Sequence, residues 1–510
     1  VALLPSLLTP ASSSSSCTCT YNHNILTVQS GYGKTERDHP GHQQPDCAKT
    51  VAIMMIQSWH SSFRSSALAV AAMAIATTGT PNAAFAYDNG LGLTPPMGWN
   101  SWNKFHCDGL NETLVLDMAD ALIESGLHDA GYTYINLDDC WQKSRNKDGT
   151  IQEDLDKFPS TIPALVDNIH DKGLLFGLYS DAGYRTCALR PGSLGYEVQD
   201  ATTYASWDVD YLKYDNCYAD PLTAKSRYKA MHDALNSTDR PIFFSMCEWG
   251  WQDPATWARE YANSWRTTGD IKPTWESWTM ILDQNDQWHE YAGPGGWNDP
   301  DMLEAGNGEL LDSLVQARSH FTLWCLIKAP LLLGNDLRAM SDEILEIISN
   351  REVIAWNQDK LGHQGHKVAT YFADGTRAST KQQFTTQRQL RTQQQHQTAS
   401  NVKGDASKSS LSSLSSSNPN AKWTDDKDGP LQVWTGKLSE DRIALVLFNR
   451  SPTAANITAE WNDIGLDAST SANVRCVWWH KDLGSFSASF TAEVESLGVA
   501  AFELSPVQYQ

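Results

Sequence analysis

The chain has 510 residues and a formal net charge of −21 at pH 7, from 39 Lys and Arg against 60 Asp and Glu. A chain of this length favours two domains, one of them large. The acidic balance argues against a nucleic-acid partner or an anionic membrane surface, because both need a basic patch.

Residues 1–86 carry no periodic pattern typical of a fold. Within them, 54–86 has a weakly basic start, a short apolar run at 67–76 and a small-x-small triplet at 84–86. This order is typical of a secretory signal, and the run is too short to span a bilayer. We therefore expect a mature chain that begins near Tyr87 and is secreted to the cell exterior or wall, or is vacuolar. A Ser-rich organellar transit peptide is the alternative.

A strand–helix pattern fills the next part of the chain. Between Met97 and Asp336, short apolar segments recur at intervals of roughly 20 to 40 residues, and each ends in polar or charged residues. Stretches with apolar residues at three- and four-residue spacing, such as TLVLDMADALIESGLHDAG, lie between them. Strand then helix, repeated about eight times over roughly 250 residues, predicts a (β/α)8 TIM barrel. We place it at residues 87–361.

Residues 362–510 follow a different pattern. DRIALVLFNR, VRCVWWH and GVAAFELSP are short alternating segments with no helix between them, which predicts a small antiparallel β-sandwich domain. A Gln- and Ser-rich stretch at 382–420 interrupts it. Such a composition cannot bury enough apolar surface to offset chain entropy, so we expect a disordered insertion with no role in chemistry.

Secretion accords with two further features of the sequence. Four Asn-x-Ser/Thr triplets could accept glycans: Asn111, Asn236, Asn449 and Asn456. Seven cysteines lie beyond residue 87, at positions 107, 140, 187, 217, 247, 325 and 476. An odd number in an oxidising compartment indicates disulfide bridges and at least one free thiol.

Carboxylates gather where the predicted barrel strands end: Asp138, Asp139, Asp181, Asp215, Glu248, Asp270, Asp299 and Asp301. Active sites of such barrels lie at this end. A hard cation is one interpretation of the cluster. Lys213 and Arg266 on the same face argue against it, and so does the lack of a His pair at metal-ligand spacing. We expect neither a metal nor a cofactor.

Paired carboxylates without a metal suggest glycoside hydrolysis, in which one is an ionised nucleophile and the other donates a proton. The 20 tryptophans suit a site whose flat rings stack on a sugar. Lys213 and Asp215 share one face of a strand, so Lys213 should lower the pKa of Asp215. Asp270 could keep its proton through neighbours of like charge. These arguments alone do not rank the carboxylates.

Six segments carry a family resemblance: GLGLTPPMGWNSWNKF, YINLDDCW, LKYDNC, FSMCEWGW, SWRTTGDI and GGWNDPDML. In this order they resemble the motifs of the α-galactosidases of glycoside hydrolase family 27, in a plant- or algal-like form. The resemblance is close over 87–361 and looser in the C-terminal domain. It implies a cofactor-free, retaining exo-enzyme that removes terminal α-linked galactose from oligosaccharides, polysaccharides or glycolipids.

The resemblance also implies roles for individual residues. Asp215 would be the nucleophile and Asp270 the general acid/base. The galactose pocket would be lined by Trp102, Asp138, Asp139, Tyr179, Lys213, Glu248, Trp249, Arg266 and Asp301. Disulfides would join Cys107 to Cys140 and Cys187 to Cys217. Cys325 and Cys476 are then expected to be buried free thiols. Cys247 should line the pocket without a nucleophilic task, because no His accompanies it.

Alternatives remain open at this point. The same mechanism could serve an α-N-acetylgalactosaminidase or a β-L-arabinopyranosidase. Asp138 and Asp139 leave room for a 6-hydroxymethyl group, and Glu248 with Trp249 should fill the space that an acetamido group needs. A galactose-binding protein without catalysis is the third possibility, and the intact carboxylate pair argues against it. We expect α-galactoside substrates, possible transfer of galactose to another sugar, and a monomer or homodimer.

Overall fold

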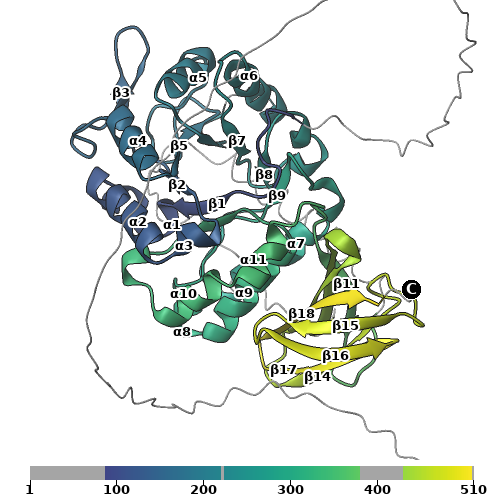
Figure 1. Cartoon of the computed structure of the whole chain (residues 1–510). Coiled ribbons are helices and arrows are strands. Elements are labelled where there is room, and N and C mark those ends of the chain that lie inside the picture. Colours follow the sequence, from purple (N-terminus) through teal and green to yellow (C-terminus); the bar gives the residue numbers. More distant parts are fainter. Residues whose placement is uncertain (1–86, 220–222, 379–428, 508–510) are drawn as a thin grey trace, which may run out of the picture. The chain divides into compact units, whose positions relative to one another are not determined.

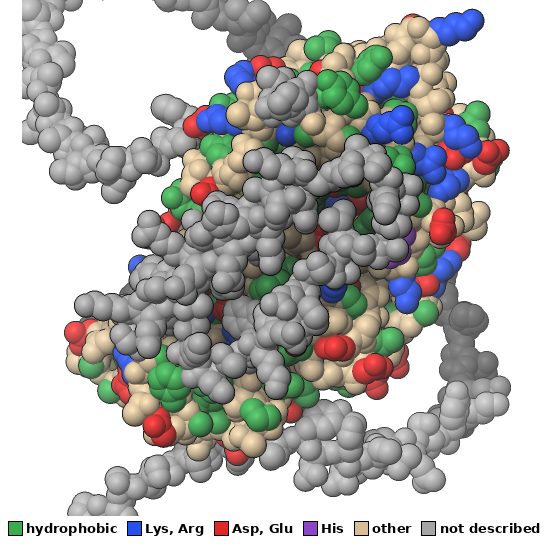
Figure 2. Space-filling model, turned by 180° about the vertical axis from the view of Figure 1, so that it is seen from behind, with side chains coloured by type: hydrophobic (Ala, Val, Ile, Leu, Met, Phe, Trp, Pro, Cys, Tyr) green, Lys and Arg blue, Asp and Glu red, His purple; other side chains and the backbone are tan. Residues whose placement is uncertain are grey.

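The computed structural model describes residues 87–219, 223–378 and 429–507, which are drawn as ribbon in Figure 1. The expected leader at 1–86 and the expected insertion at 382–420 lie outside the described residues, so both stay predictions. Among the described residues, no helix has the length and apolar character that crossing a bilayer requires. On the face shown in Figure 2, positively and negatively charged side chains are mixed over the described surface.

Eight parallel strands form the main sheet, in the order β10-β1-β2-β5-β6-β7-β8-β9. Leu303 follows β9 and pairs in parallel with Leu333 of β10, which closes the circle between the two ends. This architecture confirms the predicted (β/α)8 barrel. The strands are β1 (Met97–Asn100), β2 (Tyr134–Asn136), β5 (Leu175–Asp181), β6 (Tyr211–Asp215), β7 (Phe243–Met246), β8 (Ser264–Arg266), β9 (Trp297–Asp299) and β10 (Leu331–Leu333).

Helices surround this sheet in Figure 1. Helix α2 shows why they form: its N-cap residue Asn111 accepts a hydrogen bond from the Leu114 amide, and its buried side chains recur at helical spacing. The α-helices are α1 (Trp102–Gly109), α2 (Glu112–Glu124), α3 (Leu127–Ala130), α4 (Ile162–Asp171), α5 (Glu197–Ser206), α6 (Ala224–Asn236), α7 (Trp275–Asp286), α8 (Glu309–Asp312), α9 (Leu314–Leu326), α10 (Asp342–Ile348) and α11 (Arg351–Asn357). A hairpin of β3 (Gln142–Arg145) and β4 (Ile151–Glu153) follows β2.

Strand β6 separates two apolar layers. Leu212 and Tyr214 belong to the large core between strands and helices, whereas Tyr211 belongs to a small cluster inside the barrel. Within that cluster, the rings of Tyr211 and Phe243 stack with centroids 5.0 Å apart. Because side chains alternate along a strand, Lys213 and Asp215 share the interior side with Tyr211. The strand therefore delivers both charged groups to the carboxyl end of the barrel.

The strands described in the C-terminal part all pair antiparallel, as the sequence predicted. A six-stranded sheet has the order β11-β12-β13-β18-β15-β16, and β14 pairs with β17. Apolar side chains from both sheets form one core, which makes the domain a sandwich. The strands are β11 (His366–Tyr371), β12 (Leu431–Lys437), β13 (Ile443–Asn449), β14 (Ala455–Glu460), β15 (Ser471–Cys476), β16 (Lys481–Ser487), β17 (Ser489–Val494) and β18 (Val499–Pro506). The expected domain boundary at 361 falls between α11 and β11.

Candidate active site

Asp215 is the last residue of β6 and is almost fully buried, with 6 % of its surface exposed. Its Oδ2 accepts a hydrogen bond from the Tyr179 hydroxyl at 2.9 Å, and its Oδ1 accepts one from the Asn216 amide at 3.0 Å. Burial raises the pKa of Asp215 to about 6; Lys213 opposes this shift and the charge of Asp270 adds to it. The expected lowering of the Asp215 pKa by Lys213 is therefore present, and the effect of burial is larger.

Lys213 forms its ion pair with Asp138. Its Nζ lies 2.7 Å from Asp138 Oδ2 and 5.3 Å from the centre of the Tyr179 ring. Burial alone would lower the pKa of Lys213, but the charges of Asp138 and other acidic neighbours raise it well above its ordinary value. Lys213 thus stays protonated between Asp138 and Asp215, and its field reaches both carboxylates.

Asp138 and Asp139 lie just beyond β2, after Leu137, and are held by neighbouring polar groups. Asp138 Oδ2 also accepts a hydrogen bond from Asn100 Nδ2 at 3.0 Å. Both oxygens of Asp139 accept backbone amides, from Cys140 at 2.7 Å and Ala188 at 2.8 Å. Burial raises the pKa of Asp139 although these amide bonds oppose the shift. Two fixed carboxylates therefore line one side of the barrel mouth.

A second group of charges stands at the ends of β8 and β9. Arg266 Nη2 lies 2.9 Å from Asp301 Oδ2 and 3.1 Å from Asp270 Oδ1. Asp301 is 5 % exposed and its Oδ2 also accepts the Ile271 amide at 2.9 Å. The side chain of Asp270 is 71 % exposed. One buried guanidinium thus holds an exposed carboxylate, Asp270, beside the mouth, where its charge is felt by buried Asp215.

Glu248 does not lie where the sequence placed it. On β7, Ser245 pairs with Lys213 and so faces the interior, and Cys247 returns to that side, with its Sγ 3.6 Å from Arg266 Nη1. Glu248 lies beyond Met246, the last residue of β7, and is fully buried toward α6, which carries Arg227. The charges that shift its pKa are accordingly Asp253 and Arg227, while burial raises that pKa to about 9. Glu248 is thus a buried neutral acid behind the site, which corrects its assignment to the sugar pocket.

Two more predicted residues are partly exposed near the ends of the barrel strands. Trp249 packs edge-on against Trp251, with ring centres 4.9 Å apart. Trp102 begins α1 just after β1, is partly exposed and contacts the interior cluster. Cys247 is buried with its thiol near Arg266, as expected. Sequence reasoning missed Asn100 and Asn216, whose only signal is a polar residue at a strand end.

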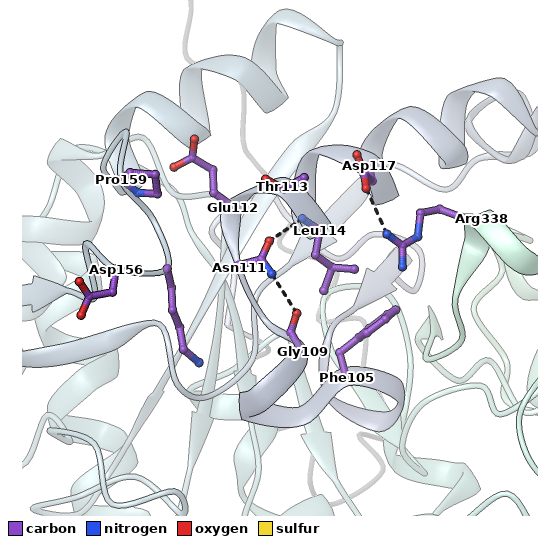
Figure 3. Close-up of a pocket in the computed structure, with 11 residues that line it drawn as sticks. Phe105, Gly109, Asn111, Glu112, Thr113, Leu114, Asp117, Asp156, Pro159 and Arg338 are labelled. Carbon is purple, nitrogen blue, oxygen red and sulfur yellow. Dashed lines mark hydrogen bonds and ion pairs between the residues drawn. The ribbon is translucent and has the colours of Figure 1, made fainter.

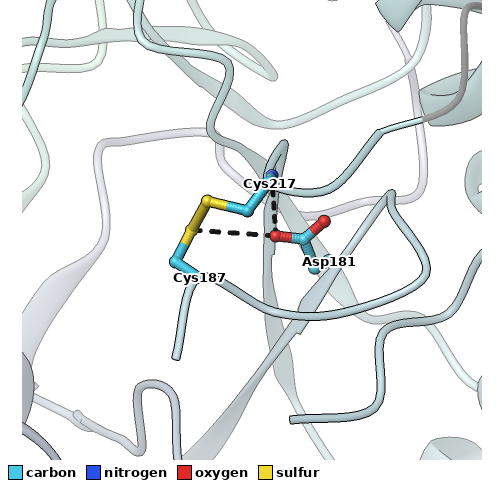
Figure 4. Close-up of side chains that lie close together, drawn as sticks. All are labelled: Asp181, Cys187 and Cys217. Carbon is cyan, nitrogen blue, oxygen red and sulfur yellow. Dashed lines mark hydrogen bonds between the residues drawn. A yellow bond between two sulfur atoms is a disulfide. The ribbon is translucent and has the colours of Figure 1, made fainter. Parts of the chain in front are cut away.

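The two expected disulfides are present, Cys107–Cys140 and Cys187–Cys217, and Cys247, Cys325 and Cys476 are buried. Figure 4 shows Asp181 beside the second bridge. Asp181 Oδ2 accepts the Cys217 amide at 2.9 Å and lies 3.9 Å from Cys187 Sγ. Because the two sulfurs are bonded to each other, they are not thiolate ligands for a metal. Asp181 instead fixes the loop that follows β6.

A surface hollow of about 690 Å³ lies apart from these residues, at the start of α2 (Figure 3). Asn111 lines it, and its Oδ1 accepts the Leu114 amide at 2.9 Å. Asn111, Asn236 and Asn456 are exposed. Asn449 is fully buried, and its Nδ2 donates to the carbonyl oxygens of Thr453 and Val494. The fold therefore leaves no room for the glycan expected on Asn449.

A parallel barrel whose strand ends carry paired carboxylates and interleaved cations defines a barrel glycosidase. Comparisons with known proteins narrow this class. The family model described as "Alpha galactosidase A" matches residues 94–359, and "Alpha galactosidase C-terminal beta sandwich domain" matches 428–504. The chain belongs to the α-galactosidase (melibiase) family, as its motifs predicted.

Individual α-galactosidases are similar to this chain over most of their length. The chain is 48% identical to an α-galactosidase of Cyamopsis tetragonoloba over 421 residues, which is 82% of this chain and 88% of that protein. It is 46% identical to an α-galactosidase of Coffea arabica, over 82% of this chain and 95% of that one. The crystal structure of α-galactosidase I from Mortierella vinacea superposes with a TM-score of 0.69 at 35% identity, covering 83% and 100% of the two chains.

Proposed function

We propose that this protein is a retaining exo-α-galactosidase, with Asp215 as the nucleophile and Asp270 as the general acid/base. One arrangement carries the proposal. Asp215 is a buried carboxylate, and each of its oxygens accepts a hydrogen bond. Arg266 holds the exposed carboxylate of Asp270, which is close enough to raise the pKa of Asp215. A fixed nucleophile and a solvent-accessible proton carrier are what double displacement requires.

The reaction takes two steps. In the first, an oxygen of Asp215 forms a bond to the anomeric carbon of galactose while the bond to the leaving oxygen breaks, and Asp270 gives its proton to that oxygen. In the second, Asp270 takes a proton from water, the water oxygen bonds to the anomeric carbon, and the bond to Asp215 breaks. Two inversions restore the original anomeric configuration. A sugar hydroxyl in place of water would give galactosyl transfer.

The neighbouring charges would select galactose. Asp138 and Asp139 are placed to accept hydrogen bonds from the 4- and 6-hydroxyls, and Lys213 to donate to the 3- and 4-hydroxyls. Glucose differs at the 4-hydroxyl, so it would leave these buried groups unpaired, which costs a pocket of this kind several orders of magnitude in kcat/KM. We expect no α-glucosidase activity.

The choice between galactose and its N-acetyl relative rests on fewer residues than the sequence suggested. Glu248 is buried toward α6, so Trp249 is the member of that pair that is left to contact the sugar. We infer that Trp249 occupies the space an acetamido group would need. Discrimination against α-N-acetylgalactosaminides is then steric and depends on one side chain.

A substrate panel tests the function directly. The purified protein is assayed with p-nitrophenyl α-galactoside, α-N-acetylgalactosaminide, α-glucoside and β-L-arabinopyranoside. The proposal expects kcat/KM to be at least a hundredfold higher on the first than on the others. Turnover of none of them, with galactose bound, would indicate a sugar-binding protein. A higher rate on the arabinopyranoside or the N-acetyl sugar would favour the corresponding alternative.

We also propose that the protein works in the secretory route, outside the cell or in the vacuole. Two disulfides near the active site suit an oxidising compartment. Asn111 is exposed, and a glycan on its Nδ2 would leave its Oδ1 free to cap α2. Digestion with an amidase that removes N-linked glycans should increase electrophoretic mobility. Light scattering would decide between a monomer and a homodimer.

A further inference from the structure

Three loops at the mouth of the barrel expose large aromatic side chains. Tyr184, Tyr218 and Trp251 are 61 %, 47 % and 47 % exposed. They follow β5, β6 and β7, which are neighbours in the sheet. The same strand ends carry Tyr179, the nucleophile Asp215 and the Cys247–Trp249 turn. Bulky aromatic side chains usually bury much of their surface. Three exposed aromatic side chains at one end of one barrel therefore suggest a ligand-binding surface.

The loops are held together and are not free to turn these rings away. The Tyr184 amide donates to the Tyr218 carbonyl at 3.2 Å. Gly183 permits this approach, because a Cβ there would lie 1.9 Å from the Cys217 carbonyl oxygen. The Cys187–Cys217 bridge ties the same two loops directly before Tyr218. On the third loop, Trp251 packs edge-on against Trp249 with ring centres 4.9 Å apart.

Backbone strain marks the same loops. Tyr218 has φ +42° and Trp249 has φ +56°, in the left-handed region that bulky residues rarely adopt. Such conformations cost of order 1–3 kcal/mol each and persist where the surroundings impose them, which is often at ligand sites.

We propose that Tyr184, Tyr218 and Trp251 form an aromatic rim that binds the sugar rings attached to galactose, so that these three side chains set how much the leaving part of the substrate contributes to kcat/KM. This rests on the proposed function, because it assigns the part of the substrate that leaves. A pyranose ring has an apolar face that stacks on tyrosine or tryptophan, while its hydroxyls stay in water. The galactose pocket is lined by charges, whereas the rim offers flat apolar surface to the next rings.

The test compares two substrates that differ only beyond galactose: methyl α-galactoside, which is too small to reach the rim, and raffinose. The variants are Trp251→Ala, Tyr218→Asn, which suits the left-handed backbone, and the two combined. Trp251→Phe keeps a flat ring. Trp479→Ala is the matched control, because Trp479 is 45 % exposed on the C-terminal domain.

The ratio of kcat/KM for raffinose to that for methyl α-galactoside should fall about fivefold in each single variant and more than tenfold in the double variant. Trp251→Phe should restore most of the ratio, and Trp479→Ala should leave it unchanged. An unchanged ratio in these variants, which includes equal losses of kcat/KM on both substrates, would contradict the proposed rim. A larger loss of kcat/KM on a galactolipid in detergent than on raffinose would also contradict the proposal.

A binding measurement separates this proposal from the proposed function. Titration of the Asp215→Asn variant with raffinose and with galactose, by calorimetry, needs no turnover. Adding Trp251→Ala to that variant should weaken raffinose about fivefold relative to galactose. If the wild-type protein cleaves no α-galactoside, the proposed function is wrong. The effect of Trp251→Ala on raffinose binding still tests the rim in that case, because the measurement needs no turnover. Equal weakening of both sugars would contradict the rim.

Discussion

Tyr179 donates its phenolic hydroxyl to Oδ2 of Asp215 across 2.9 Å. The bond joins neighbouring strands, since Tyr179 of β5 is in register with Lys213 of β6. Burial raises the pKa of Tyr179 well above its ordinary value, and the negative charge of Asp215 raises it further. The hydroxyl therefore remains a donor at every working pH, and it fixes the direction in which the carboxylate of Asp215 points.

Tyr179→Phe removes this bond and nothing else of comparable size. The hydrogen bond lowers the pKa of Asp215, so its loss should raise that pKa. The nucleophile is then protonated at a higher pH, and the acid limb of the kcat/KM profile should move upward. At the optimum we expect about a tenfold loss, from a bond to a charged group worth about 1.5 kcal/mol. A lower rate with an unmoved limb would mean that Tyr179 only shapes the pocket.

Lys213→Met should move the acid limb further in the same direction. Lys213 opposes the burial of Asp215 more strongly than Tyr179 does. Wild-type activity should fall as pH drops through about 6, because Asp215 then gains a proton. In the variant this fall should begin at a higher pH. The pH profiles of kcat/KM with an aryl α-galactoside would measure the acid limb in the wild type and in the variant. An acid limb that moves to lower pH in the variant would contradict the role of Lys213 beside Asp215.

Glu248→Gln should stabilise the protein, and more so at higher pH. The folded state keeps the Glu248 proton up to a pKa of about 9, whereas the unfolded chain releases it near 4.3. The wild type therefore loses stability as pH rises between these values. At pH 7 the effect is on the order of 3 kcal/mol. Denaturant unfolding at pH 5, 7 and 8 should show a gap that widens with pH. A constant gap would mean that Glu248 is ionised in the fold.

Trp249→Ala should relax the choice of sugar. The smaller side chain leaves space beside the 2-position, so the ratio of kcat/KM for the α-N-acetylgalactosaminide to that for the α-galactoside should rise at least tenfold. Glu248→Gln is the matched control and should leave this ratio unchanged, because its side chain faces α6. If the control changes the ratio and Trp249→Ala does not, the orientations assigned to these two residues are reversed.

The sequence was sufficient to predict the barrel, the antiparallel C-terminal domain and the two disulfides. Strand period explains why Lys213 and Asp215 share a side, and the family motifs identified Arg266, Asp270 and Asp301 before their ion pairs were known. The error at Glu248 has a physical cause. Strand alternation ends with Met246, so the side to which Glu248 turns depends on the conformation of the loop that follows, which is not readable from one chain.

Other features depend on burial, which composition and spacing do not reveal. The pKa of Asp215 is raised because the strand end is enclosed, and only a charge neighbour, Lys213, was visible in the sequence. Asn449 has the pattern of a glycan acceptor but closes the end of β13 with its amide. The exposure of Tyr218 and Trp251 depends on how the loops after β6 and β7 fold, which the sequence pattern does not specify.

The two carboxylates should respond oppositely to an added nucleophile. Asp270→Gly lacks the proton donor, yet an activated aryl α-galactoside can still form the bond to Asp215. Azide should then displace Asp215 and give the α-galactosyl azide. An inverted product from this variant would mean that Asp270 is the nucleophile.

The most direct test of the account is the product that Asp215→Gly forms with azide and the same activated substrate. Without azide we expect a loss of at least 10⁴-fold in kcat, since the covalent route is closed. With azide, attack on the opposite face of the ring should give the β-galactosyl azide, identified by the coupling of its anomeric proton. The β-azide confirms Asp215 as the nucleophile of a retaining α-galactosidase, and the α-azide contradicts it.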